Sequence, residues 1–405
     1  MQRERRQASA DRKTLAALDR AAGSPRSPFI TFAGVFFALA LACNVLIVVA
    51  SVPDRRGLWL GLLAALLPTL GYAWLVISFD RYEREPWRNL LGAFGWGAVV
   101  ATLFSILLSD LADRVLAAIL GARIGGALAL TFGSPIIEES LKGLALLGLL
   151  LLFRHEFDGV LDGLVYGALI GLGFAMTENV LYLGQAYIAG GLGALGQLFI
   201  AREIFGGLGH ALYSGTLGAA VGWARARYGR GMARFVVPLL GWTLAIAQHS
   251  LWNLGASAIA ARSDPTTPLL GLVAIQTLFF IVPGLGILAF IAMRSGRAES
   301  HILHEQLADE VANGILTRRE YAILSVGRLR HLALFAALRH GGVRRWSLQQ
   351  RFFQAAAELA LCKHHNCQGE AVARDAPRAP EAIYRAQLTI LRAQLTILRA
   401  ALAQD

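Results

Sequence analysis

The stretch that decides the fold is FITFAGVFFALALACNVLIVVAS, residues 29–51, which contains no charged side chain. A helix needs about 20 mostly apolar residues to cross a bilayer, and this run is long enough. A cleaved secretion signal has a shorter apolar core, followed by a small-residue cleavage site. We therefore interpret the run as a retained membrane-spanning helix, preceded by a polar, basic tail at residues 1–28.

The composition of the whole chain shows the same bias. Of its 405 residues, 56% are hydrophobic and only 16% are charged, whereas a soluble domain carries about 25% charge. This excludes an ordinary soluble enzyme and a disordered protein, and three cysteines are too few for a disulfide framework. The predicted spans are residues 29–51, 57–79, 90–108, 124–153, 159–185, 204–223, 235–260 and 269–293. We therefore predict an all-α polytopic membrane protein with about eight transmembrane helices in residues 29–293.

Basic residues in the loops predict how these helices are oriented. The N-terminal tail and every second loop after it hold 15 Lys and Arg residues, and the alternate loops hold 6. Lys and Arg concentrate on the cytoplasmic side of membrane proteins. We therefore expect a multi-pass protein of the inner (plasma) membrane with both termini in the cytoplasm. The net charge of +11 does not form a basic face interleaved with aromatic residues, so we predict no nucleic-acid partner.

Residues 294–405 are more polar and are predicted to form a small cytoplasmic helical region. Thr317-Arg-Arg-Glu320 has the pattern of a capping box, which marks the start of a helix. Near the end, the heptad RAQLTIL occurs twice, at residues 385–391 and 392–398. Apolar residues at heptad spacing pair helices, although a recent tandem duplication explains the repeat equally well.

Charged residues inside the predicted spans are few, and they are costly there and usually functional. The fourth span contains PIIEESLK, residues 135–142, with Glu138, Glu139 and Lys142. On a helix Lys142 reaches either carboxylate, because they lie three and four residues before it. Two carboxyl groups in different environments can serve as base and acid. The alternative is an ion pair that only neutralises itself.

The next three spans each add polar residues. Glu178 lies in the fifth span, His210 in the sixth, and His249 and Asn253 lie four residues apart in the seventh, so they share one helix face. A single histidine in an apolar helix is usually a satisfied core residue. Their combination with intramembrane carboxylates at middle-to-outer depth predicts one site. The glycines of residues 163–173 have the spacing of closely packed helices.

These motifs, in this order, resemble the PrsW family of intramembrane proteases. They are PxxEExxK at 135–142, DGLVYG at 162–167, GLGFAxxEN at 171–179, HAL at 210–212 and HxxWN at 249–253. A more distant similarity connects the chain to CAAX-processing proteases, whose pattern is EExxxR, FxxxH and HxxxN. This chain has Lys142 in place of their Arg and Glu178 in place of their first His, and it keeps His249 and Asn253.

The resemblance implies hydrolysis of a peptide bond in a membrane-anchored protein. In the PrsW family the implied substrate is an anti-sigma factor, cut near the outer side of the membrane to start a stress response. Substrate protein and lipid bilayer are therefore the partners that we expect.

Two mechanisms fit these residues. In the first, Glu178, His210 and His249 bind Zn²⁺, and Glu138 or Glu139 activates its water. In the second, no metal is present: one of the two carboxylates deprotonates a water, and His249 and Asn253 stabilise the oxyanion. We favour the second, because the sequence lacks HExxH and has the paired glutamates.

Two other functions stay open at this point. Intramembrane carboxylates and histidines also build proton-coupled transporters, which usually show a repeat between two halves of the membrane region, and no such repeat is visible in this sequence. A non-catalytic membrane scaffold is the third interpretation, but a scaffold has no need for every one of these polar residues.

Overall fold

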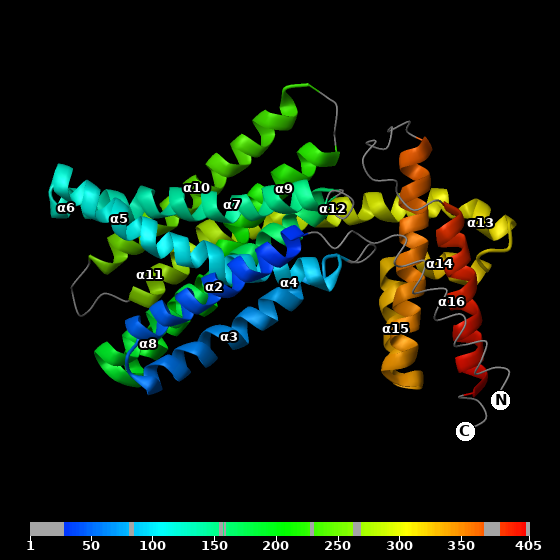
Figure 1. Ribbon diagram of the computed structural model, residues 1–405, viewed down its shortest axis with the longest axis horizontal. Coiled ribbons are helices and arrows are strands. Elements are labelled where there is room, and N and C mark those ends of the chain that lie inside the picture. Colours follow the sequence, from blue (N-terminus) through cyan, green and yellow to red (C-terminus); the bar gives the residue numbers. More distant parts are fainter. Residues whose placement is uncertain are drawn as a thin grey trace. The chain divides into compact units, whose positions relative to one another are not determined.

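The computed structural model describes residues 28–80, 85–153, 157, 159–226, 231–261, 269–367 and 381–401, and their regular secondary structure is helical (Figure 1). Residues 1–27 of the predicted N-terminal tail lie outside the described residues. The described residues form two compact units. The larger, here called the bundle, comprises Pro28–Asp80 and Glu85–Ser295, and the smaller, here called the C-terminal unit, comprises the described residues from Gly296 onward.

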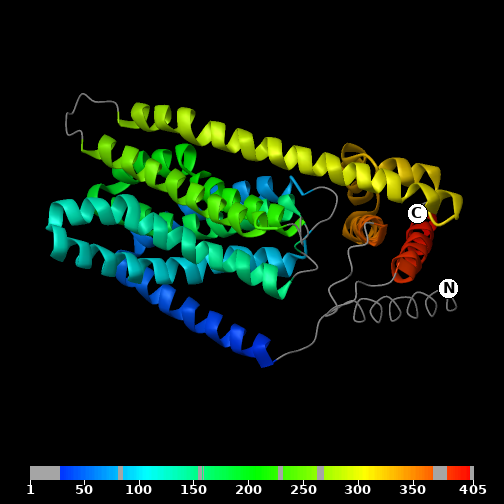
Figure 2. The same ribbon diagram turned by 90° about the horizontal axis from the view of Figure 1, so that it is seen from above.

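The bundle is built from long helices that run roughly parallel or antiparallel to one another (Figure 2). The described residues of the bundle also contain four short π-helical segments (η). The elements are α2 (Pro28–Ser51), α3 (Arg55–Ile77), α4 (Trp87–Gly95), η1 (Trp96–Ala101), α5 (Thr102–Leu120), α6 (Ala122–Leu128), η2 (Ala129–Gly133), α7 (Ser134–Leu152), α8 (Val160–Phe199), η3 (Ile200–Phe205), α9 (Gly209–Ala226), α10 (Ala233–Ala260), α11 (Leu269–Gln276), η4 (Thr277–Ile281) and α12 (Val282–Gln306).

The predicted all-α polytopic fold is confirmed, although the predicted number of about eight spans is only approximate. Six helical stretches in the described part of the chain are long and apolar enough to cross a membrane, or seven if the bent pair Arg318–Leu324 and Gly327–His364 forms one span. The prediction gives about eight for two reasons. Two predicted spans lie in one helical stretch, Val160–Ala226. The predicted span 124–153 carries three charged side chains, more than any other predicted span.

The middle of the bundle is the stretch formed by α8 and α9. Inside the protein, 83% of the apolar segment of this stretch is buried, whereas only 11% of the apolar segment Gly34–Ser51 is buried. A helix that is apolar on all sides belongs in the interior of a large protein or in a membrane. The outer helices instead expose large apolar side chains, among them Trp74, which is 73% exposed. Such surfaces suit a lipid environment, and the polar side chains of the site are held by the inner helices.

A glycine seam holds α8 against α9, as the spacing of residues 163–173 predicts. A Cβ atom added at Gly163, Gly167 or Gly171 would lie 2.1–2.2 Å from a backbone carbonyl oxygen of α9. For Gly171 that oxygen belongs to His210. Only glycine permits so close an approach of two helix backbones. The seam therefore fixes the height of His210 relative to α8.

Helix α8 is interrupted at Gly190 and Gly191. Gly191 has φ of 65°, in the left-handed region that favours glycine. After this break the chain continues through a short helical segment into η3 and returns toward α9. The break thus lets residues 192–205 border the cavity described below.

The C-terminal unit has its own apolar core, formed by leucines, alanines and Phe352 and Phe353. Its helices, besides the end of α12, are α13 (Ala308–Ala312), α14 (Arg318–Leu324), α15 (Gly327–Cys367) and α16 (Glu381–Ala401). The predicted capping box is confirmed, because Thr317 Oγ1 accepts from the Glu320 N–H at 3.2 Å while Glu320 accepts from the Thr317 N–H at 2.8 Å. The RAQLTIL repeats form most of α16, and Leu388, Leu391 and Leu395 are buried in this core.

Candidate functional site

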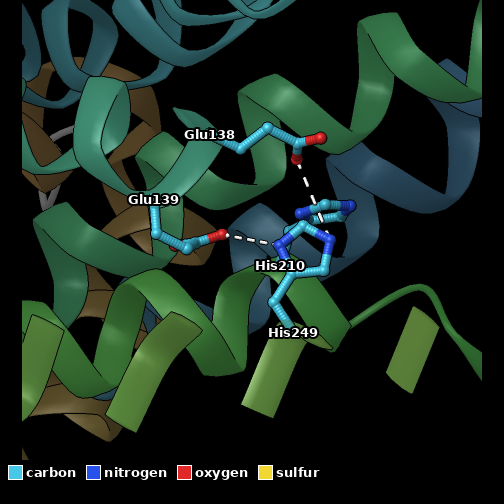
Figure 3. A group of neighbouring side chains, drawn as sticks. All are labelled: Glu138, Glu139, His210 and His249. Atoms are coloured by element: carbon cyan, nitrogen blue, oxygen red, sulfur yellow. Dashed lines mark hydrogen bonds and ion pairs between the residues drawn. The ribbon is translucent and has the colours of Figure 1, made fainter. Parts of the chain in front are cut away.

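Four inner helices bring the sequence-predicted polar residues to one place. Helix α7 carries Glu138 and Glu139, α8 carries Glu178, α9 carries His210, and α10 carries His249 and Asn253. Figure 3 shows both carboxylates of α7 pointing toward the two imidazole rings. One potential ligand atom from each of Glu138, Glu139, His210 and His249 lies within 4.8 Å of the others.

Glu139 is fully buried and fully hydrogen-bonded. Its Oε1 accepts from Lys142 Nζ at 2.8 Å and lies 3.1 Å from His249 Nδ1. Its Oε2 accepts from Ser214 Oγ at 3.0 Å. Ser214 lies one turn after His210 on α9, but its hydroxyl binds this carboxylate. Buried carboxylates need such partners, so Glu139 is the anchored member of the pair.

Glu138 has a different environment although it is the next residue. Its side chain is buried, yet Oε2 has no hydrogen-bond partner among the described residues. The nearest cationic or imidazole nitrogens to Oε2 are Lys142 Nζ at 3.6 Å and His249 Nε2 at 3.8 Å. Buried polar atoms without a partner are rare in native proteins and call for an explanation. This oxygen is available to a substrate, a water or a metal ion.

Lys142 is the cation at the centre of the site. Its fully buried ammonium group lies 2.9 Å from His210 Nδ1, and 3.8 Å above the centre of the Phe174 ring. Together with its contact to Glu139, these neighbours satisfy the buried charge. Lys142 lies near both carboxylates, as expected, but at unequal distances: 2.8 Å from Glu139 and 3.6 Å from Glu138. The two glutamates therefore have different environments.

Glu178 is held from two sides. Its Oε2 accepts from Arg202 Nη2 at 2.5 Å and lies 3.1 Å from His210 Nε2. Arg202 also donates through Nε to Asn179 Oδ1 at 2.6 Å and lies over the Tyr182 ring. Glu178 therefore orients the His210 ring, and Arg202 in turn orients Glu178.

His249 lies between two aromatic neighbours. Its ring is stacked on Tyr213 with centroids 4.9 Å apart, and it meets His210 edge-on at 4.9 Å. The Tyr213 hydroxyl is buried and lacks a hydrogen-bond partner in the described part of the chain. Asn253 lies one turn after His249, and its amide donates to the Leu130 carbonyl at 3.1 Å.

A cavity of about 710 Å³ opens onto these groups. Glu138, Glu178, His210, Tyr213, His249 and Asn253 all line it, together with the segment after the α8 break. Most of the remaining lining is apolar, which is typical of a site that binds an organic ligand or a peptide. Glu139 does not line the cavity and acts through its neighbours.

The donor set fits a metal ion in its chemistry. Two imidazoles with a carboxylate are a common ligand set for catalytic zinc, which leaves one position open. His210, His249 and Glu138 provide such a set, because their potential ligand atoms lie within 4.8 Å of one another and Glu138 Oε2 has no hydrogen-bond partner among the described residues. Glu178, a predicted ligand, lies outside that cluster and is bound to Arg202.

Comparison with known proteins gives this region a family. A family model described as PrsW family intramembrane metalloprotease matches residues 85–284, which contain every residue of the cluster. Residues 85–284 belong to the PrsW family. No solved structure matches the chain significantly.

Several PrsW proteases are similar to the chain. The relatives include Protease PrsW of Bacillus subtilis (strain 168), 35% identical over 106 residues that are 26% of this chain and 44% of that protein. Protease PrsW of Geobacillus kaustophilus (strain HTA426) is 33% identical over 36% of this chain and 58% of its own length. The corresponding protein of Clostridioides difficile (strain 630) is 33% identical over 30% and 49%. The chain thus spans about half the length of the curated relatives it matches.

Within the PrsW-family region, the structure adds two residues that the sequence did not indicate. Arg202 lies in a loop between two predicted spans, where a single basic residue looks like a topology signal. Tyr213 sits one turn after His210 in an apolar helix, where an aromatic residue looks like core. Only the contacts with Glu178 and with the His249 ring identify them.

Proposed function

We propose that this protein is an intramembrane endopeptidase in which Glu138 activates the water that attacks a peptide bond. The observation that carries the proposal is that Glu138 lines the cavity while its buried Oε2 has no hydrogen-bond partner among the described residues. A general base must reach the proton that it removes, and a carboxylate on the wall of a substrate-sized cavity, with one oxygen left without a partner, meets that condition. The PrsW-family relatives support a peptide substrate.

In the proposed reaction, Glu138 takes a proton from water as the oxygen attacks the scissile carbonyl. The resulting oxyanion accepts hydrogen bonds from donors that are already in place, which is usually the largest catalytic contribution. Three residues on the cavity wall are candidates for these donors: Tyr213 through its hydroxyl, Asn253 through its amide, and His249. His249 Nε2 lies 3.8 Å from Glu138 Oε2, and it donates when the imidazole carries a proton on both nitrogens, because Nδ1 is directed at Glu139. Glu138 then passes its proton to the leaving amine, so the C–N bond breaks and the carboxylate is regenerated.

The remaining charged residues hold these groups in position. Lys142 and Ser214 fix Glu139, and Glu139 Oε1 sets the direction of the His249 ring through Nδ1. Glu178 does the same for His210. In a PrsW-type metalloprotease, His210, His249 and a carboxylate of the cluster would hold zinc, which polarises a carbonyl and acidifies water.

We propose further that the substrate is a membrane-anchored protein of the anti-sigma-factor kind, cut near the outer side of the membrane. We also propose that the protein lies in the plasma membrane, with both termini in the cytoplasm. The support is the family resemblance and the excess of Lys and Arg in alternate loops. Membrane proteomics of a deletion strain identifies the substrate as the single-span protein that accumulates uncut.

The decisive experiment reconstitutes the full chain with that substrate in liposomes. The wild-type protein should cleave it, and the Glu138→Gln and His249→Ala proteins should not. Ser140→Ala is the matched control, because Ser140 lies on α7 but is directed away from the cavity, with its hydroxyl on the Ile136 carbonyl. Cleavage at the wild-type rate by Glu138→Gln would refute the proposal. Loss of activity in a chelator, restored by zinc, would assign a metal to the water-activating step.

A further inference from the structure

The C-terminal unit exposes an apolar helix face that none of its described residues covers. The face lies on the first part of α15, before the break at Gly342, where φ is 62°. Leu329, Leu332 and Phe335 are 39%, 56% and 64% exposed. On the opposite side of the same helix, Leu334 and Ala337 are buried in the core of the unit. Exposed apolar residues that form one continuous face mark an interaction site.

Arginines frame this face along the helix axis. Arg328, Leu332, Phe335 and Arg339 are separated by four, three and four residues, so they form one stripe. Both arginines are exposed. Residues 321–357 contain six arginines and no acidic residue. The surface is therefore apolar in the middle and basic at both ends.

We propose that this face docks onto the surface of an anionic lipid bilayer. Amphipathic helices with basic and apolar residues lie in the interface plane, with apolar side chains at the boundary of headgroups and acyl chains. Arginine heads extend to the lipid phosphates while their stems cover apolar surface. The α15 face has both features, and its long arginines stand one turn beyond the leucine and the phenylalanine.

Two observations favour a bilayer over a second copy of the chain. In a symmetric contact between two such faces, Arg328 and Arg339 of both copies would meet without an acidic partner from residues 321–357, and like charges oppose association. A bilayer is also present at high local concentration, because only 33 residues separate the predicted span 269–293 from Gly327. Anionic lipid headgroups supply the complementary charge.

The test measures amide hydrogen exchange of residues 327–341 in the full chain, in nanodiscs of zwitterionic or anionic lipid. Exchange should be slower by about tenfold or more in the anionic discs, since each arginine near such a surface contributes about fivefold. Phe335→Glu should remove the difference. Ile397→Glu is the matched control, because Ile397 is 56% exposed on α16, outside the face. Unchanged exchange in α16 shows that each variant is folded.

The charge requirement is tested separately. Arg328→Gln and Arg339→Gln should each reduce the protection in anionic discs by about fivefold, and Arg319→Gln on the exposed side of α14 should not. Equal exchange in both lipids, or protection that survives Phe335→Glu, overturns the proposal. Protection that rises with protein concentration and ignores headgroup charge also overturns it, and assigns the face to a second copy.

Discussion

Each unit of the protein buries a glutamate among cations, and the two sites are completed differently. In the C-terminal unit Glu310 is fully buried and accepts from Lys363 Nζ at 3.1 Å and from Arg385 Nη2 at 2.6 Å. In the bundle, Glu138 lines a cavity, and its Oε2 has no hydrogen-bond partner within the described ranges. The Glu310 carboxylate is thus bound by two cationic side chains, whereas one oxygen of the Glu138 carboxylate can still accept a hydrogen bond.

This difference separates a structural ion pair from a candidate reactive group. The hydrogen bonds with Glu310 raise the pKa of Arg385 above its usual range, so the pair stays charged. Such an arrangement ties α16 to α13 and needs nothing else. A buried carboxylate with unused capacity is unfavourable by itself, and a protein retains it where a ligand or a reaction completes it.

The largest expected effect is on Glu138. Glu138→Gln should lower cleavage of the reconstituted substrate between about 10²-fold and 10⁴-fold, because a general base is lost. The thermal unfolding of the bundle should hardly change, since the replaced oxygen Oε2 makes no hydrogen bond among the described residues. Fluorescence-detected unfolding in detergent measures the thermal stability. A Glu138→Gln protein that unfolds at a lower temperature but still cleaves would show that Glu138 has a structural role and not a catalytic one.

Glu310→Gln should show the opposite pattern. Removing one partner of a buried ion pair leaves cations unpaired and costs about 3 kcal/mol. Because Arg385 is the contact from α16, amide exchange in α16 should accelerate, while cleavage by the bundle stays close to wild type. Glu305→Gln is the control, because its side chain is 54% exposed and pairs with His301 at the surface. Loss of cleavage with unchanged exchange in α16 would give Glu310 a role in the reaction.

How much of this was predictable from the sequence depends on the range of the interaction. Helices, spans and the Thr317 cap follow from local rules of length, apolarity and capping, and the structure contains them. The breaks at Gly190 and Gly342 were not expected, because a glycine inside an apolar run predicts close packing as readily as a kink.

The candidate site was predictable in its members and not in their roles. Intramembrane polar residues are rare, so Glu138, Glu139, His210 and His249 stand out in the sequence. Spacing could not tell which glutamate Lys142 and Ser214 would anchor, since this depends on how α7 is rotated against α9. Arg202 was missed because its partner Glu178 lies on another helix.

The helix seam tests whether the site depends on its scaffold. Gly171→Ala places a Cβ 2.2 Å from the His210 carbonyl oxygen, so α9 has to shift. Overpacking of this kind costs about 2 kcal/mol and should displace His210. We expect reduced stability of the bundle and reduced cleavage together. Gly148→Ala on α7 is the matched control, because a Cβ there meets nothing within 4 Å, and it should leave both unchanged.

The smallest expected effect concerns Arg202, which binds Glu178 much as Arg385 binds Glu310. Arg202 binds Glu178 and Asn179 at the same time through two different nitrogens, which the single ammonium of lysine cannot reproduce. Arg202→Lys should therefore leave Glu178 less well oriented and lower kcat by about tenfold, the usual order for an outer partner of a site. Because Arg202 acts through Glu178, KM should stay unchanged. Arg114→Lys is the matched control for replacing an arginine by a lysine, because Arg114 forms an exposed ion pair with Asp110. If KM rose while kcat held, Arg202 would instead contact the substrate, and the pairing of Glu178 would belong to recognition and not to the alignment of His210.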